Sequence, residues 1–133
     1  MSSVITFYFS KNLLVIKIAF DLLTFNTLVT RGLMHIHRMK IIHRDVKSAN
    51  CLVDKHWIVK ICDFGLSRII TESPMRDSSS AGTPEWMAPE LIRNEPFSEK
   101  CDIFSLGVIM WELCTLNRPW EGVPPERVCM FDR

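Results

Sequence analysis

The sequence predicts an α+β fold that is mainly helical, and three stretches carry this prediction. Residues 28–38 place apolar side chains at i, i+4 and i+7, which gives a helix one buried face. Residues 98–116 are apolar on almost every side, as in a helix at the centre of a domain. Between them, 51–53 and 57–61 are short apolar stretches on either side of a polar turn, which predicts a β-hairpin.

The N-terminal stretch, 1–27, matches none of these patterns and is left unassigned. Its apolar segments are interrupted by Lys11, Lys17 and Asp21, so no stretch approaches the ~20 apolar residues that a transmembrane helix needs. No basic segment precedes the apolar residues, as one would in a secretory signal peptide. We therefore expect one domain over 28–133, with no membrane segment, in the cytoplasm or also in the nucleus.

The other predicted elements follow in chain order. Ile41–Ile42 is a short apolar strand after the first helix, and 66–86 is a loop rich in serine and threonine. A short helix is predicted at 87–93. Ser98 is an N-cap residue for the long helix, and the two prolines at 124–125 begin a further helix.

Composition and charge exclude several classes of protein. Hydrophobic residues make up 47% of the chain and charged residues 23%, which is typical of globular proteins. The net charge is +1, and no basic run is dense enough to indicate nucleic-acid binding. The five cysteines form no Cys-x-x-Cys pair, which favours reduced thiols. Cys62, which directly precedes an aspartate, is either a buried cysteine or a reactive thiol.

Two loops at the ends of the predicted hairpin carry side chains suited to phosphate chemistry. Asp45 and Asn50 frame the first loop, and Asp63 follows the second strand of the hairpin. A carboxylate can orient a hydroxyl group and accept its proton, and carboxylate and amide oxygens are ligands that magnesium prefers. Because the hairpin returns the chain toward its start, we expect the two loops to share one site.

The residues of these loops resemble the signature of protein kinases. His-Arg-Asp at 43–45 with Asn50 matches H-R-D-x-x-x-x-N, and Asp-Phe-Gly at 63–65 and Ala-Pro-Glu at 88–90 follow in the order of the family. A wider similarity points to the tyrosine-kinase-like group, and most closely to plant Raf-like MAP kinase kinase kinases. It is carried by three segments, 63–68, 82–90 and 100–113, and the resemblance as a whole covers roughly residues 31–128.

The resemblance also indicates the type of kinase and the layout of its domain. Lys47, two residues after the aspartate of the first loop, and Thr83 in a Gly-Thr-Pro-Glu run are typical of serine/threonine kinases. The implied fold is partial, with helices of the C-lobe and a small hairpin that carries both loops. It has a catalytic loop at 43–50, an activation segment at 63–90 and a buried central helix at about 98–116.

This resemblance implies phosphoryl transfer from ATP, with Mg²⁺, to serine or threonine on a protein. Asp45 would accept or orient the substrate hydroxyl, and Lys47 would neutralise the transferring phosphate and contact the nucleotide. Asn50 and Asp63 would hold the magnesium and, through it, the nucleotide. The implied partner is a protein substrate, with a downstream kinase among the candidates, and neither nucleic acid nor a membrane.

Further residues have structural roles by the same resemblance. His43 and Phe64 would pack in an internal hydrophobic spine, and Gly65 would supply flexibility after the metal ligand. Asp102 would accept hydrogen bonds from the backbone of the catalytic loop, with an ordinary acid at a helix N-terminus as the alternative. Glu90 would pair with an arginine of later helices that this sequence does not contain.

Arg44 precedes the catalytic-loop aspartate, as in kinases that are switched by phosphorylation of the activation segment. A phosphate on a nearby hydroxyl would pair with Arg44 and order the segment, and the alternative is a solvated, serine-rich loop. The candidate hydroxyls are those of Ser73, Ser78, Ser79, Ser80 and Thr83.

The sequence also departs from the family pattern. No glycine precedes Gly32, which excludes a glycine-rich loop, and no glutamate precedes Glu72, which excludes the usual lysine–glutamate pair. We therefore expect the N-lobe to be absent and the chain on its own to be inactive or weakly active. The alternative is a non-catalytic interaction protein that binds partners or substrates of a full-length kinase. A small-molecule phosphotransferase is disfavoured by Thr83 and the Ala-Pro-Glu segment.

Overall fold

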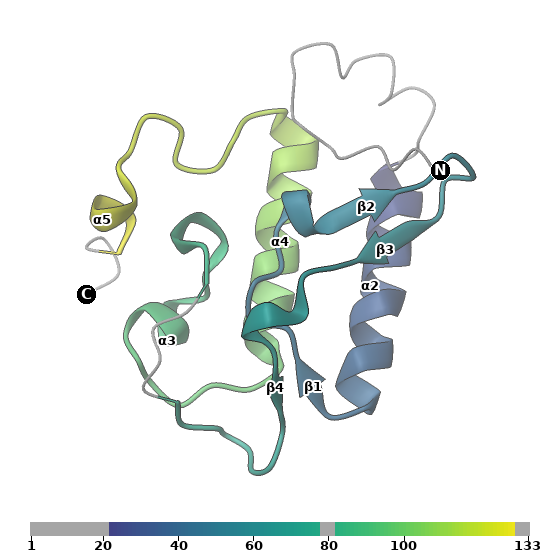
Figure 1. The fold of residues 1–133 in the computed structure, drawn as a ribbon. Coiled ribbons are helices and arrows are strands. Elements are labelled where there is room, and N and C mark those ends of the chain that lie inside the picture. Colours follow the sequence, from purple (N-terminus) through teal and green to yellow (C-terminus); the bar gives the residue numbers. More distant parts are fainter. Residues whose placement is uncertain (1–21, 78–81, 130–133) are drawn as a thin grey trace.

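The computed structural model describes residues 22–77 and 82–129, and its two long helices form its framework. Helices α2 (Leu22–Arg38) and α4 (Lys100–Thr115) lie side by side, and a β-hairpin packs against α2 (Figure 1). The predicted α+β class with mainly helical content is confirmed. Three of the candidate hydroxyls, those of Ser78, Ser79 and Ser80, lie outside the described residues.

Helix α2 begins earlier than the sequence analysis predicts. Its start at Leu22 lies six residues before residue 28, because the apolar spacing continues upstream to Phe25. Phe25, Val29 and Leu33 are all buried in the main core, where they belong to one cluster with Ile109 of α4. The predicted boundary between an unassigned segment and the domain at residue 28 is therefore too late for this helix.

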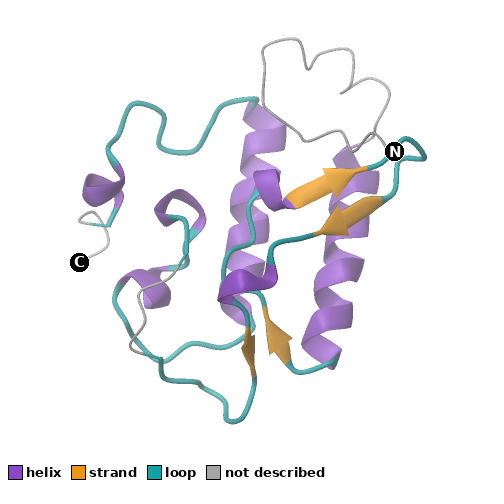
Figure 2. Cartoon of the chain, in the orientation of Figure 1, coloured by secondary structure: helices purple, strands orange, loops and turns teal. Residues whose placement is uncertain are grey.

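Among the described residues, two pairs of antiparallel strands build the β part, which Figure 2 draws in orange. Strand β1 (Ile41–Ile42) is confirmed and pairs with β4 (Arg68–Ile69). Strands β2 (Cys51–Val53) and β3 (Val59–Ile61) form the predicted hairpin. Strand β4 lies in a stretch that was predicted to be a loop. Unlike Ile41–Ile42, its two residues include only one apolar side chain, so no pattern in the sequence indicated a strand there.

The hairpin turn is closed by Asp54. One of its carboxylate oxygens accepts hydrogen bonds from the backbone N–H of His56 (2.8 Å) and of Ile58 (3.1 Å). These bonds, chiefly that from Ile58, lower the pKa of Asp54 below its ordinary value. The short turn fixes the direction in which β3 returns toward the first loop.

Helix α4 is confirmed, but its predicted burial on all sides is wrong in part. One face, which includes Asp102, Ile109 and Glu112, is buried. The opposite face exposes between 44% and 45% of each of four large apolar side chains: Ile103, Phe104, Met110 and Trp111. The sequence shows that the helix is apolar all round, whereas exposure depends on which elements pack against it.

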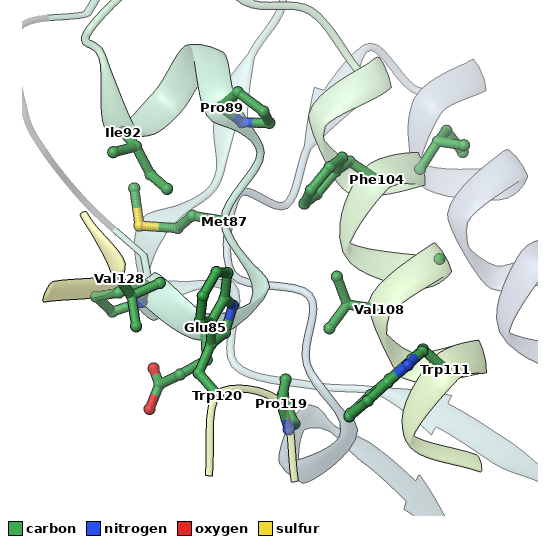
Figure 3. A pocket seen from close by; sticks show the side chains of 13 residues that line it. Glu85, Met87, Pro89, Ile92, Phe104, Val108, Trp111, Pro119, Trp120 and Val128 are labelled. Carbon is green, nitrogen blue, oxygen red and sulfur yellow. The ribbon is translucent and has the colours of Figure 1, made fainter. Parts of the chain in front are cut away.

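The C-terminal part of the chain packs beside α4 around a second cluster of buried residues. Helix α3 (Pro89–Ile92) is shorter than predicted, and α5 (Pro125–Val128) begins at the predicted proline pair. An apolar groove of about 720 Å³ lies between α4 and these segments, with Phe104, Trp111 and Trp120 on its walls (Figure 3). Within the described part of the chain, no helix is long and apolar enough to span a membrane.

Candidate active site

The first loop is fixed to helix α4 by a buried carboxylate. Asp102, with no exposed surface, accepts hydrogen bonds from the backbone N–H of His43 (2.9 Å) and of Arg44 (2.8 Å). His37 Nε2 lies 2.8 Å from the same carboxylate. Arg44 has a positive φ of 69°, a conformation that persists only where the surroundings hold it. The hydrogen bonds to Asp102 supply that constraint.

Asp45, which is 8% exposed, is held among three polar side chains. Its Oδ2 lies 2.9 Å from Lys47 Nζ, and its Oδ1 accepts a hydrogen bond from the hydroxyl of Thr83 at 2.7 Å. Lys47 Nζ donates to the same Thr83 hydroxyl at 2.7 Å. Asn50 Nδ2 donates to the backbone carbonyl of Asp45 at 2.9 Å and lies 3.3 Å from Oδ2. The structure thus brings the catalytic-loop residues together with Thr83.

The second loop, which carries Asp63, is joined to the first loop through His43 and Asn50. The backbone N–H of Cys62 donates to the carbonyl of Asn50 at 2.9 Å. His43 Nε2 donates to the carbonyl of Cys62 at 3.0 Å, and His43 Nδ1 accepts from the N–H of Asp45 at 3.3 Å. These partners require a neutral imidazole with its proton on Nε2. Hydrogen bonds therefore connect Cys62, which precedes Asp63, with two residues of the loop that carries Asp45.

Phe64 packs on His43 with a ring-centroid distance of 4.8 Å, although 41% of Phe64 is exposed. Asp63 has a positive φ of 64°, whereas Gly65, which was predicted to supply flexibility, is not among the residues with a positive φ. A Cβ atom at Gly65 would lie 3.3 Å from Asp63 Oδ1, which itself accepts from the Gly65 N–H at 3.4 Å. Glycine is thus favoured at position 65 by the close approach of the carboxylate rather than by backbone freedom.

Comparison with known proteins identifies the architecture around these loops. A family model described as the protein kinase domain matches residues 17–129. The chain belongs to the protein kinase domain family. The match begins upstream of residue 28, and its first residues lie outside the described part of the chain. The confirmed helical and hairpin elements are consistent with part of a protein kinase domain.

Several plant kinases are similar to this protein kinase domain. The probable serine/threonine-protein kinase SIS8 of Arabidopsis thaliana is 55% identical over 100 residues, which are 74% of this chain and 10% of that protein. The serine/threonine-protein kinase CTR1 of the same plant is 52% identical over 102 residues, 75% of this chain and 12% of that protein. The chain thus spans about a tenth of these relatives. The resemblance to serine/threonine-type kinases is confirmed.

Side-chain oxygen atoms of this kinase domain can bind magnesium, together with other ligands that complete the coordination shell of the metal. Asn50 uses its amide nitrogen toward Asp45, which leaves its side-chain oxygen as the atom that can bind a metal. Asp63 is exposed. Among the described residues, no group of three or more histidine, cysteine or acidic side chains could hold a metal ion. Two protein oxygens with waters and nucleotide phosphates form the kind of site that magnesium accepts.

Glu112 of α4 is a site residue that the sequence analysis missed. It is 1% exposed and accepts hydrogen bonds from Ser48 Oγ (3.1 Å) and Trp86 Nε1 (2.7 Å). It therefore ties the catalytic loop to the segment that follows Thr83. The available signal was a single acid in an otherwise apolar stretch of helix, because such an acid needs buried donors.

We expect the stability of the chain to depend on the protonation of Glu112. Burial raises the pKa of Glu112 above its ordinary value of 4.5, and the bonds from Trp86 and Ser48 oppose this shift. The folded chain then holds the proton more tightly, so this stabilisation is complete below the ordinary pKa and is lost as pH rises through the folded-state pKa. Relative to Glu112→Gln, the free energy of unfolding of the wild type should fall over this range in urea titrations. A difference that does not change with pH would contradict this assignment.

The remaining predicted residues occupy separate places. Arg44 Nη1 donates to Asp77 Oδ2 at 2.7 Å, and Thr83 contacts Asp45 and Lys47 as described above. Ser73 is exposed, and Glu90 lies in the first turn of α3. Asp77 was not a candidate in the sequence analysis, because a lone aspartate in a serine-rich loop carries no pattern.

The cysteines near the site are poor nucleophiles. Burial raises the pKa of Cys51 to about 12, and burial with the charge of Asp63 raises the pKa of Cys62. The buried Cys101 also has a raised pKa. Cys62 is only partly buried, so it is not the buried cysteine of the first interpretation. Its raised pKa nevertheless disfavours a reactive thiol, because the thiolate is the reactive form.

We expect iodoacetamide to discriminate among these thiols. Cys114 is exposed, whereas Cys51 and Cys101 are buried. In the native chain at pH 8, mass spectrometry should show alkylation of Cys114 first, and of Cys51 and Cys101 only after denaturant is added. Alkylation of Cys62 faster than Cys114 would indicate an activated thiol instead.

Proposed function

We propose that this domain transfers the terminal phosphoryl group of ATP, with Mg²⁺, to serine or threonine side chains of proteins. The observation that carries the proposal is the Thr83 hydroxyl, which donates to Asp45 Oδ1 and accepts from Lys47 Nζ, both at 2.7 Å. This is the arrangement that a general base and a neighbouring cation need around an attacking hydroxyl. The first loop is thus already shaped to bind a hydroxyl of the threonine type.

Each residue of the site has a role in this proposal. Asp45 orients the substrate hydroxyl and takes up its proton, while Lys47 neutralises charge that develops on the transferring group. Asn50 and Asp63 hold the magnesium, which offsets the negative charge of the phosphates when the nucleotide is bound. Asp102 and Glu112 keep the catalytic loop in place from α4. The chemistry requires positioning and charge neutralisation rather than a covalent intermediate.

The finer assignments are also part of this proposal. Similarity to the two Arabidopsis serine/threonine kinases supports a plant Raf-like protein that acts in a MAP kinase cascade. Its protein substrate would then be a downstream kinase. The proposal includes a location in the cytoplasm, with the nucleus as an additional candidate.

Nucleotide binding tests the proposal directly. We expect ATP with magnesium to raise the melting temperature of the chain, because a ligand that binds the folded state stabilises it. ATP with EDTA should have a smaller effect, and Asp63→Asn should lose the magnesium-dependent part. Glu126→Gln, at an exposed acid of α5, is the matched control and should behave as the wild type. No shift in the wild type would reject nucleotide binding by this chain.

The second candidate is a non-catalytic interaction protein that binds partners or substrates of a full-length kinase. The exposed apolar face of α4 and the groove beside it (Figure 3) favour this function, since large apolar patches commonly mark interaction sites. It predicts no melting shift with ATP and magnesium, together with co-purification with a full-length related kinase. A magnesium-dependent shift without such a partner would favour the enzyme.

A further inference from the structure

Asp77 joins two arginines from different parts of the chain. Its Oδ2 accepts hydrogen bonds from Arg44 Nη1 at 2.7 Å and from Arg68 Nε at 2.8 Å. Arg44 belongs to the catalytic loop and directly precedes Asp45, and Arg68 belongs to strand β4. One carboxylate oxygen thus connects the first loop, the strand after the second loop and the middle of the activation segment.

Of the two ion pairs of Asp77, the one with Arg44 is expected to be stronger, because its arginine is more deeply buried. The Arg44 side chain is 1% exposed and that of Asp77 is 20% exposed, whereas that of Arg68 is 39% exposed. A buried guanidinium needs a counter-charge, and removal of its partner leaves a costly uncompensated charge. An ion pair at a half-exposed side chain contributes less. Arg44 also lies over the ring of Phe97, with its Cζ atom 5.1 Å from the ring centre.

The contacts on either side of Asp77 show what this ion pair fixes. The N–H of Ile70 donates to the carbonyl of Lys40 at 2.7 Å. The N–H of Met75 donates to the carbonyl of Phe97, also at 2.7 Å. Farther along the segment, Thr83 reaches Asp45. Asp77 lies between these attachments in the sequence, so its carboxylate holds the described part of the segment that ends at Asp77 against the catalytic loop.

We propose that Asp77 is a positioning residue whose carboxylate anchors the middle of the activation segment on Arg44 of the catalytic loop and on Arg68 near the start of the segment, so that this anchor needs no added phosphate. The anchoring rests on the contacts above, and its consequence for catalysis rests on the proposed function. Arg44 already has a carboxylate partner in Asp77. A phosphate on one of the candidate serines would therefore have to compete with Asp77 for Arg44 or act elsewhere in the segment.

Hydrogen exchange measured by NMR tests the anchor without any nucleotide. In Asp77→Asn, the amides of Ile70 and Met75 should exchange at least about tenfold faster, because the segment opens locally once its charged contact is lost. Amides in the middle of α2 and α4 should be unaffected. Glu72→Gln, at an exposed acid of the same segment, should leave all of these rates within about twofold of the wild type.

Two further measurements separate an anchor from a general loss of stability. In Asp77→Ala, sodium formate should restore protection of Met75, whereas sodium chloride at equal ionic strength should not. Arg68→Gln should speed exchange more in the wild type than in Asp77→Asn, as expected for partners in one interaction. A smaller effect remains because Arg68 Nη1 also donates to the carbonyl of Ser67 at 3.0 Å. Unchanged exchange in Asp77→Asn, or an equal effect of Arg68→Gln in both backgrounds, would overturn the proposal.

A kinetic measurement tests the positioning role itself. If Asp77 positions the segment that carries Thr83, Asp77→Asn should lower kcat about tenfold and leave the KM for ATP within about twofold. A raised KM with unchanged kcat would overturn this role. Because the exchange experiments need no phosphoryl transfer, an inactive wild type would count against the proposed function and leave the anchor intact.

Discussion

Replacement of Asp102 by alanine is expected to lower the free energy of unfolding by about 3–5 kcal/mol. Its carboxylate has no exposed surface and accepts the backbone N–H groups of His43 and Arg44. Removal would leave these buried donors without an acceptor, and each unsatisfied donor costs about 1–3 kcal/mol. Arg44 would also lose the constraint on its positive φ. Urea denaturation followed by circular dichroism measures the change.

A matched variant distinguishes this effect from the loss of any acid. Glu95→Ala removes an exposed acid between α3 and α4, and it should change the free energy of unfolding by less than about 0.5 kcal/mol. The loss of unfolding free energy in Asp102→Asn should lie between the losses in Glu95→Ala and Asp102→Ala, because an amide oxygen can accept one of the two backbone hydrogen bonds. A loss below about 1 kcal/mol in Asp102→Ala would mean that the catalytic loop is held by other contacts.

Asp45→Asn is expected to lower phosphoryl transfer by about 10²- to 10⁴-fold. Asparagine matches the size of aspartate but cannot take up the proton of an attacking hydroxyl. It also removes the negative partner of Lys47, which lies 2.9 Å from Asp45 Oδ2. A radiometric assay with labelled ATP and a mixture of serine- and threonine-containing peptides measures the transfer, since the activity of the wild-type chain is expected to be low.

Glu121→Gln, at an exposed acid after α4, is the control for this experiment and should retain the wild-type rate. Circular dichroism should show that Asp45→Asn keeps the wild-type helical content. A rate for Asp45→Asn within about twofold of the wild type would reject Asp45 as the general base. Transfer to tyrosine-containing peptides alone would reject the serine/threonine assignment.

The parts of the site that depend on neighbours in the sequence were predictable. Asp45 and Asn50 are five residues apart in one loop, and their contact is local. The hairpin that returns Asp63 was predicted from two apolar stretches and a polar turn. The kinase resemblance suggested hydrogen bonds from the backbone of the catalytic loop to Asp102, an acid fifty-nine residues from His43.

The parts that depend on long-range packing were not predictable from local patterns. The pairing of β4 with β1, the pairing of Asp77 with Arg44 and the exposure of one face of α4 all involve residues far apart in the sequence. A single aspartate in a loop has no motif, and Arg68–Ile69 of β4 lacks the two adjacent apolar residues that mark β1. The side of an apolar helix that is covered depends on the whole chain rather than on the helix.

The most direct test of the central claim asks whether the two loops share one metal–nucleotide site. Manganese, which suits the same oxygen ligands as magnesium, broadens the NMR signals of nearby amides when it binds together with ADP. We predict that Mn²⁺ with ADP broadens the amides of both Asn50 and Gly65 in the wild type, and that Asp63→Asn abolishes both effects. Broadening of only one loop, or of neither, would contradict a shared site.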